Sequence, residues 1–379
     1  MLMISDTLTT QFEIRHSASA ILFGLSLLLA ATPGQASEQI QWSGDVRSGY
    51  FSSEKEQRNG SKDNSEELRA RLRWGGTLTV SPGWQLGARF AGQLSNNQED
   101  THAGLSFSST SAGLNRGDAT LDQLYARYQQ QHWGITLGRM QTSFKLDGVA
   151  PKSLDRNDSN NMNITYTDGV HAWTRVADDW RLHSIVQYNA SKGSGGIRRT
   201  PLHFEDDASR LSAFFSLENK TPVGPLQQRA VSLNYLPQSL ENKNSLKDYW
   251  ALTASAAAGW PLPRSRRLLL GLQLGYAPET PDHLHEKDTG FAWQASLNLY
   301  EVMPNQNIAL VAGSAAAGWL LSPGIQSNRE MLELRYQWKI NRRAKLEARI
   351  RHRREINTPL ENLDRQQDAD FYLRFTHKM

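Results

Sequence analysis

Apolar and polar residues alternate with a period of two through most of the chain after residue 40. Residues 67–74, ELRARLRW, show the pattern: three arginines lie at every second position, with apolar residues between them. A helix turns about 100° per residue and would scatter these arginines over two faces. A strand places them all on one face, because its side chains alternate sides. The chain therefore predicts strands with one basic or polar face and one apolar face.

The turns between these segments alternate between short and long. The short turns are centred near residues such as 81–83 and 130–131, and the long loops are rich in Asn, Asp, Ser, Gly and Lys. Seven short turns and eight long loops separate sixteen expected strands. These are 40–52, 66–80, 84–95, 119–129, 132–141, 161–176, 180–190, 209–220, 227–236, 247–260, 267–278, 288–300, 307–320, 329–340, 344–357 and 367–379.

An even number of strands with short turns on one side and long loops on the other is typical of an outer-membrane barrel. Backbone N–H and C=O groups have no water to bond in hydrocarbon, so the sheet must close on itself. A barrel of this size does not fill its interior with side chains and encloses water. We expect an all-β fold: a transmembrane antiparallel β-barrel of about 16 strands in one domain, 37–379, with short periplasmic turns and long extracellular loops.

The N-terminus has the layout of a secretory signal peptide. An apolar run, 18–31, follows Arg15-His16, and small residues follow it up to Ala36. The run is short for a membrane helix. We expect cleavage near Ala36, which removes residues 1–36, and export to the outer membrane of a Gram-negative cell. The segment before the run is long, so translation could also start at Met3 or later.

Other site chemistries have weaker support. The chain has no cysteine, which excludes disulfides and thiolate metal sites. His283 and His285 beside Glu286 form only a weak candidate metal site in a polar loop, and we expect neither a metal nor a cofactor. Basic residues alternate with apolar ones, which argues against nucleic-acid binding. An outer-membrane enzyme and an adhesin remain alternatives, although no nucleophile–base set is evident.

Three segments resemble the general diffusion porins of Gram-negative outer membranes. Segment 121–144 (LDQLYARYQQQHWGITLGRMQTSF) is similar to their strand 4–strand 5 hairpin, and 154–173 is similar to the return of the third loop into strand 6. The final residues, FYLRFTHKM, are similar to the strand read by the barrel-assembly machinery, although the family usually ends in Phe rather than Met379. The resemblance implies a homotrimer in outer-membrane lipid, with a third loop that folds inward and narrows the pore.

The strand pattern also predicts which residues line the pore. With Leu68, Leu72 and Trp74 toward lipid, the alternate residues face the lumen, and closure places the last strands beside the first. A lipid-facing arginine at the bilayer midplane would cost roughly 2–4 kcal/mol. The positive charge of this wall is partly offset by four carboxylates, Asp45, Glu333, Glu347 and Asp370. The arginine wall consists of Arg47, Arg69, Arg71, Arg73, Arg89, Arg335, Arg349, Arg351, Arg353 and Arg374.

By resemblance, loop 142–160 is the constriction loop, and its Asp147, Asp155 and Asp158 would face the arginine wall and set up a transverse field. The alternative is that loop charges are only solvated and the wall arginines pair with neighbouring carboxylates. The predicted function is passive diffusion of small hydrophilic solutes and ions. A porin selective for anionic solutes, such as phosphate, carboxylates or acidic sugars, is the alternative.

Large aromatic residues near strand ends predict the interfacial girdles of a membrane barrel. Two runs of small residues, 254–259 and 312–318, predict smooth stretches of wall without a further role. The residues assigned to the girdles are Trp42, Trp84, Trp133, Trp180, Trp260 and Trp319.

Overall fold

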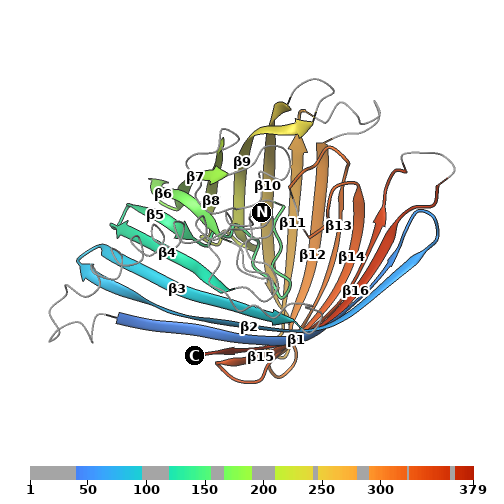
Figure 1. The fold of residues 1–379 in the computed structure, drawn as a ribbon. Helices are drawn as coiled ribbons and strands as arrows, with labels where there is room; N and C mark the ends of the chain where they lie inside the picture. The colour runs from blue at the N-terminus through green and yellow to red at the C-terminus, as the bar shows by residue number, and fades with distance from the viewer. Residues whose placement is uncertain are drawn as a thin grey trace, which may run out of the picture.

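A computed structural model describes residues 40–95, 119–154, 166–189, 210–241, 246–279, 290–321, 324–358 and 363–379. It forms a closed antiparallel barrel of sixteen strands (Figure 1). The strands are β1 (Ile40–Glu56), β2 (Lys62–Ser81), β3 (Trp84–Ser95), β4 (Ala119–Gln129), β5 (Trp133–Met140), β6 (Thr167–Ala177), β7 (Trp180–Asn189), β8 (Arg210–Asn219), β9 (Leu226–Glu241), β10 (Leu246–Pro261), β11 (Arg267–Ala277), β12 (Gly290–Met303), β13 (Gln306–Ala315), β14 (Arg329–Lys339), β15 (Ala344–Glu355) and β16 (Gln367–Lys378).

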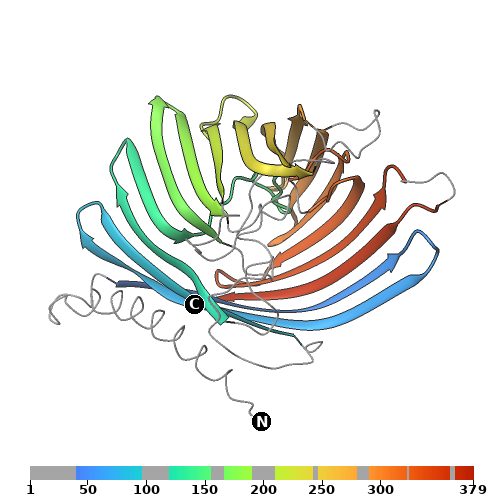
Figure 2. The ribbon, with the colours of Figure 1, turned by 45° about the horizontal axis from the view of Figure 1, so that its top comes forward.

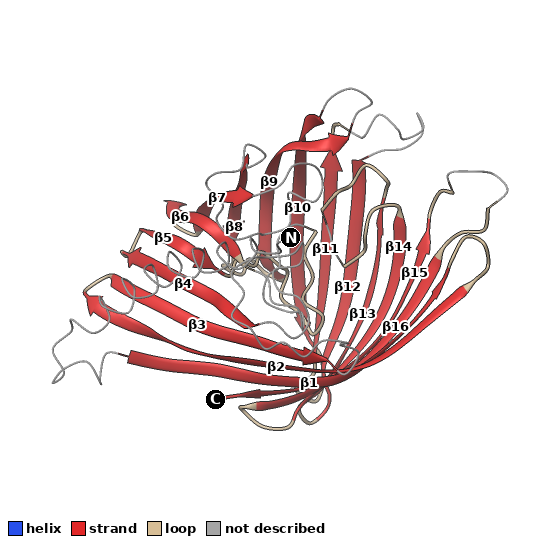
Figure 3. Cartoon of the chain, in the orientation of Figure 1, coloured by secondary structure: helices blue, strands red, loops and turns tan. Residues whose placement is uncertain are grey.

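The barrel closes where the first and last strands meet. β1 pairs antiparallel with β16, with Ser48 opposite Phe375, and every other strand pairs with its neighbours in sequence. The described residues are all strand, turn or loop (Figure 3). No helix in these ranges is long and apolar enough to cross a membrane. The predicted fold class and strand number are confirmed, whereas the predicted signal peptide, 1–36, lies outside the described residues.

The two faces of β2 differ as the alternation predicts. Leu68 and Trp74 are more than half exposed on the outside, whereas Arg71 and Arg73 are almost fully buried on the inside. Trp42 stacks on Trp74 outside the barrel, with ring centroids 4.9 Å apart. Large apolar side chains are therefore exposed toward lipid while charged ones point inward, which is the reverse of a water-soluble protein.

Some strand ends differ from the prediction. β1 and β2 continue pairing through the expected loop 53–65, as far as Glu56 opposite Lys62. A tight turn at 57–61, with Gly60 at a positive φ of 78°, allows this longer hairpin because glycine has no Cβ to clash. β6 begins at Thr167 in the described residues, outside which 161–165 of the expected strand lie, and β13 ends at Ala315 rather than 320. The residues that follow Ala315 turn into the barrel.

Candidate functional site

Every arginine of the arginine wall lies on the inner side of its strand, but the ten are not equally accessible. The side chains of Arg71, Arg73, Arg335 and Arg374 are at most 7% exposed. The side chains of the other six retain 11–20%. The buried four therefore contribute charge, and the more accessible six offer surface to a solute.

On β1–β4 the arginines share carboxylates. Arg47 lies directly opposite Arg71 across the β1–β2 pair, and like charges in that position repel. Asp45 offsets the repulsion, because its Oδ1 lies 2.7 Å from Arg71 Nη2 and 3.2 Å from Arg47 Nε. Asp122 on β4, which is fully buried, joins Arg73 at 3.0 Å and Arg89 at 2.9 Å.

On β14–β16 the same sharing occurs. Glu333 pairs with Arg335 at 2.7 Å, and Glu347 pairs with Arg374 at 2.8 Å. The remaining contacts are Asp370 with both Arg349 and Arg351, Asp368 with Arg353, and, on β2, Glu67 with Arg69. In the described part of the chain, the ten arginines thus pair with seven carboxylates, so positive charge remains in excess.

The sequence analysis missed three of these carboxylates: Glu67, Asp122 and Asp368. The alternation along β2 and β16 could have identified Glu67 and Asp368. Glu67 lies two residues before the inward-facing Arg69, and Asp368 lies two residues before the inward-facing Asp370. Asp122 is harder to predict, because the β3–β4 register shifts between Arg89 and Phe90.

The third loop enters the barrel after β5, as the resemblance implies; its described part is the green trace inside the ring of strands in Figure 2. Hydrogen bonds tie it to the inner wall at two strands. Gln228 on β9 accepts from the Asp147 backbone N–H at 3.0 Å and donates to the Lys145 carbonyl at 3.1 Å. Asn298 Oδ1 on β12 accepts from the Val149 N–H at 2.9 Å.

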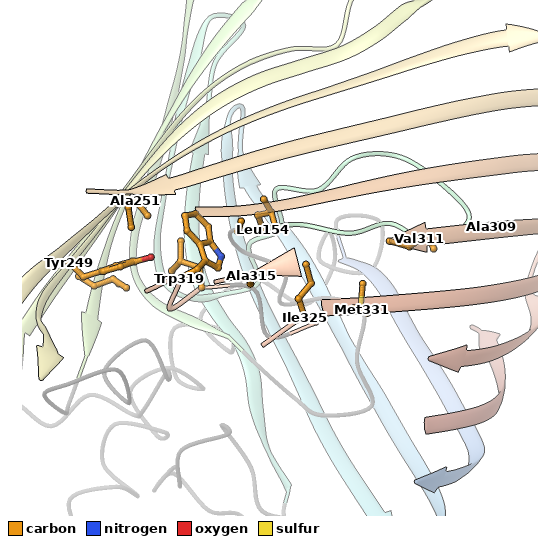
Figure 4. Close-up of a cluster of buried hydrophobic side chains, with 14 of the residues drawn as sticks. Leu154, Tyr249, Ala251, Ala309, Val311, Ala315, Trp319, Ile325 and Met331 are labelled. Carbon is orange, nitrogen blue, oxygen red and sulfur yellow. The ribbon is translucent and has the colours of Figure 1, made fainter. Parts of the chain in front are cut away.

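An apolar seat holds this loop against β9–β14. Val149, Ala150 and Leu154 are at most 1% exposed. A second inward-folding segment, 316–321 with 324–328, brings Trp319 and Ile325 into the same cluster (Figure 4). The wall residues of the seat are Leu236, Tyr249, Ala251, Ala277, Ala292, Ala309, Val311, Ala315 and Met331.

This seat accounts for part of the small-residue runs and corrects the assignment of Trp319. Trp319 is fully buried inside the barrel, so the prediction that it belongs to a lipid-interface girdle is wrong. The indole fits because Gly275 faces it: a Cβ there would lie 2.5 Å from the ring. Gly313 likewise leaves room for Ile325, and Ala257 packs with Leu146 of the third loop.

Lys152 ties the third loop to the arginine wall. Its Nζ lies 2.6 Å from Glu333 Oε2 on β14. Burial lowers the pKa of Lys152 to about 7, while Glu333 acts in the opposite direction. The described loop therefore touches the wall through a basic residue. Asp147 is exposed and lies beside β9, and Asp155 and Asp158 lie outside the described residues.

The pKa of Lys152 makes stability depend on pH. The unfolded chain keeps the Lys152 proton up to about pH 10.5, whereas the folded barrel releases it near 7. Because the unfolded state then binds more protons, this residue makes the unfolding free energy rise between pH 7 and 10.5. We expect Lys152→Met to remove that rise. Denaturant unfolding of both barrels at pH 7, 8.5 and 10 measures it, and equal pH slopes for the two would contradict it.

Residues of the family-like segments 121–144 and 154–173 also meet in space. Arg139 pairs with Asp168 at 2.8 Å, and its guanidinium lies 3.9 Å from the centroid of the Tyr166 ring. Gly138 lies opposite Gly169 in the β5–β6 register. Within the described ranges no three His, Asp or Glu side chains group as metal ligands; His283, His285 and Glu286 fall outside those ranges.

Comparison with known proteins agrees with this architecture. A family model described as Gram-negative porin matches residues 24–201. Among solved structures, the fold is similar to Pseudomonas putida OprB (TM-score 0.60, 12% identity, covering 90% of this chain and 95% of that one). A BenF-like porin from Pseudomonas fluorescens (0.57, 10%, 90% and 99%) and an anion-selective porin from Comamonas acidovorans (0.51, 13%, 90% and 99%) are also similar. No curated protein matches by sequence.

The sequence match and the barrel fold agree with each other, and the fold extends the likeness beyond the matched residues. The family model covers the N-terminal strands, and the structural likeness extends over 90% of the chain. A closed barrel with an apolar exterior and a charged inner face is a channel architecture for the outer membrane. Residues 24–201 thus match the Gram-negative porin family, and the described residues form the closed barrel that solved porins share.

Proposed function

We propose that this porin is a passive diffusion channel for small hydrophilic solutes and ions, with a weak preference for anions. The observation that carries the preference is the excess of ten wall arginines over seven carboxylates in the described part of the chain. Rings of basic side chains favour anions in a pore. One of the porins with a similar fold is described as anion-selective.

The third loop strengthens the positive side of the pore. Burial lowers the pKa of Lys145, Asp147 raises it, and Lys345 and Arg47 on the wall lower it further. Lys145 therefore lies within electrostatic reach of wall cations. This arrangement favours a basic constriction over the opposed positive and negative walls expected from the family resemblance. Homotrimer formation and recognition by the barrel-assembly machinery remain predictions from that resemblance.

Single-channel recordings in planar bilayers test the proposal. We expect ohmic currents and a reversal potential of anionic sign in a salt gradient. Removing the accessible charges, with Arg69→Gln and Arg89→Gln together, should move that potential toward cation preference, because two lumen cations are lost. Arg342→Gln, on an exposed turn, is the control and should leave it unchanged. Folded protein without current, or with strong cation preference, would overturn the proposal.

The alternative, a porin selective for anionic solutes, has one supporting observation. The ten wall arginines lie on six neighbouring strands, β14–β16 and β1–β3, and the six more accessible ones lie on four of these, β15 and β1–β3. A binding surface predicts saturable block of the current by one anion at low concentration. Diffusion alone predicts that block is weak and similar for phosphate, acetate and gluconate.

A further inference from the structure

The outer face of the barrel has a depression over β10–β13 that conduction does not explain. It has a volume of about 440 Å³, and its lining is almost entirely apolar. Its floor is one row of residues in register across the four strands: Ala256, Leu272, Ala295 and Ala312. Trp260 lines one end of the depression. The bulk of the residues in neighbouring rows makes this a groove rather than a flat apolar surface.

Two cations lie on the short turn next to this groove. Arg264 and Ser265 occupy the turn between β10 and β11 with φ of 61° and 60°, which places Arg264 at its tip. Arg266 lies an even number of residues before Leu270 and Leu272, which line the groove, so the alternation places its side chain on the same outer face. Its Nη2 lies 3.4 Å from the Val302 carbonyl oxygen.

These two arginines differ from the wall arginines in their surroundings. Among the described residues, neither Arg264 nor Arg266 has an ion pair. Glu301, which precedes Val302 on β12, accepts a hydrogen bond from the Asn305 backbone N–H through its Oε2 at 2.8 Å. The turn therefore presents positive charge that the protein does not neutralise.

A second outer depression provides a contrast. It covers β1–β5, has a volume of about 600 Å³, and includes the stacked Trp42 and Trp74. The short turns below it, 81–83 and 130–132, carry no Lys or Arg. An apolar groove beside uncompensated cations is thus a property of the β10–β13 face and not of the barrel exterior in general.

We propose that this face binds an anionic glycerophospholipid of the inner leaflet, with an acyl chain in the groove and the phosphate at Arg264 and Arg266. Short turns of such barrels lie on the periplasmic side, where the adjoining leaflet supplies phospholipid. Trp260 lines the end of the groove nearest the turn and is one residue from the strand end at Pro261, so the groove reaches the turn that carries Arg264 and Arg266. The inference rests on the membrane setting and not on the proposed selectivity.

Native mass spectrometry of the delipidated, full-length barrel in detergent tests this site. Phosphatidylglycerol and phosphatidylethanolamine with identical chains are the probes. We expect the wild-type barrel to retain phosphatidylglycerol preferentially. Arg264→Gln with Arg266→Gln should weaken that binding about tenfold or more, since each basic residue near a headgroup contributes about 1 kcal/mol. Arg342→Gln with Arg343→Gln removes the same charge from another short turn and is the matched control.

A groove-filling variant distinguishes the contribution of the lipid's acyl chain from that of its headgroup. Ala256→Leu with Ala295→Leu keeps the outer face apolar but fills the floor, and it should lower the retention of both lipids while the arginines remain. Heat-modifiable migration of each variant verifies that the barrel is folded. The proposal is overturned if wild type binds both lipids equally, if the control variant loses as much binding as the Arg264/Arg266 variant, or if the groove is occupied by a second barrel instead of lipid. A wild-type barrel that retains phosphatidylglycerol but shows no anion preference in a salt gradient would contradict only the proposed function.

Discussion

Replacing Asp122 by Asn should destabilise the barrel by about 3–5 kcal/mol, the cost of removing one partner from a buried charge pair. Asp122 is fully buried and joins Arg73 to Arg89. Asparagine preserves the shape but leaves two guanidinium groups close together without a carboxylate. Denaturant unfolding in detergent micelles measures the loss, and the added positive charge should also increase anion preference.

Two further variants identify the cause. Asp248→Asn is the control, because Asp248 is exposed and accepts a hydrogen bond from the Tyr235 hydroxyl at the end of the sheet. Arg89→Gln combined with Asp122→Asn should recover part of the lost stability, since it removes one of the unpaired cations. Unchanged stability in Asp122→Asn would show that the lumen solvates these arginines despite their burial.

Replacing Leu154 by Asp should release the third loop from its seat. Leu154 is fully buried in the apolar cluster, and an ionised carboxylate there would have no partner. We expect the loop to leave the wall, with single-channel conductance and current noise changing together. The chain has no cysteine, so Ala150→Cys gives one labelling site on the buried part of the loop.

The label distinguishes a displaced loop from a blocked pore. A thiol reagent should react slowly with Ala150→Cys alone and much faster when Leu154→Asp is added. Leu363→Asp, at a position that is already 36% exposed, is the matched control and should not alter labelling. Slow labelling in the Leu154→Asp background would mean that the loop keeps its place by its hydrogen bonds to Gln228 and Asn298.

Most of the barrel follows from local pattern. The period of two requires strands, and the change from Leu68 outside to Arg69 inside depends only on the alternation within β2. Strand ends were less predictable: the expected loop 53–65 contains residues that pair once Gly60 permits a tight turn, and Ala315 ends β13 because the next residues turn inward. The first of these ends depends on the local turn at Gly60, and the second depends on packing of the next residues against strands distant in sequence.

The sequence by itself determined that this protein forms a closed barrel with arginines inside, because alternation assigns each side chain to lipid or lumen without reference to the rest of the fold. Only the tertiary structure decided how that interior is organised. It buried Arg71 and Arg73 against Asp45 and Asp122, and it seated Leu154 and Trp319 on inward-facing alanines and glycines. The ion pairs depend on the register between nearby strands, and the apolar contacts join segments that are far apart in the chain and meet only when the barrel closes. The period-two pattern of the sequence specifies neither the register between strands nor the contacts made on closure.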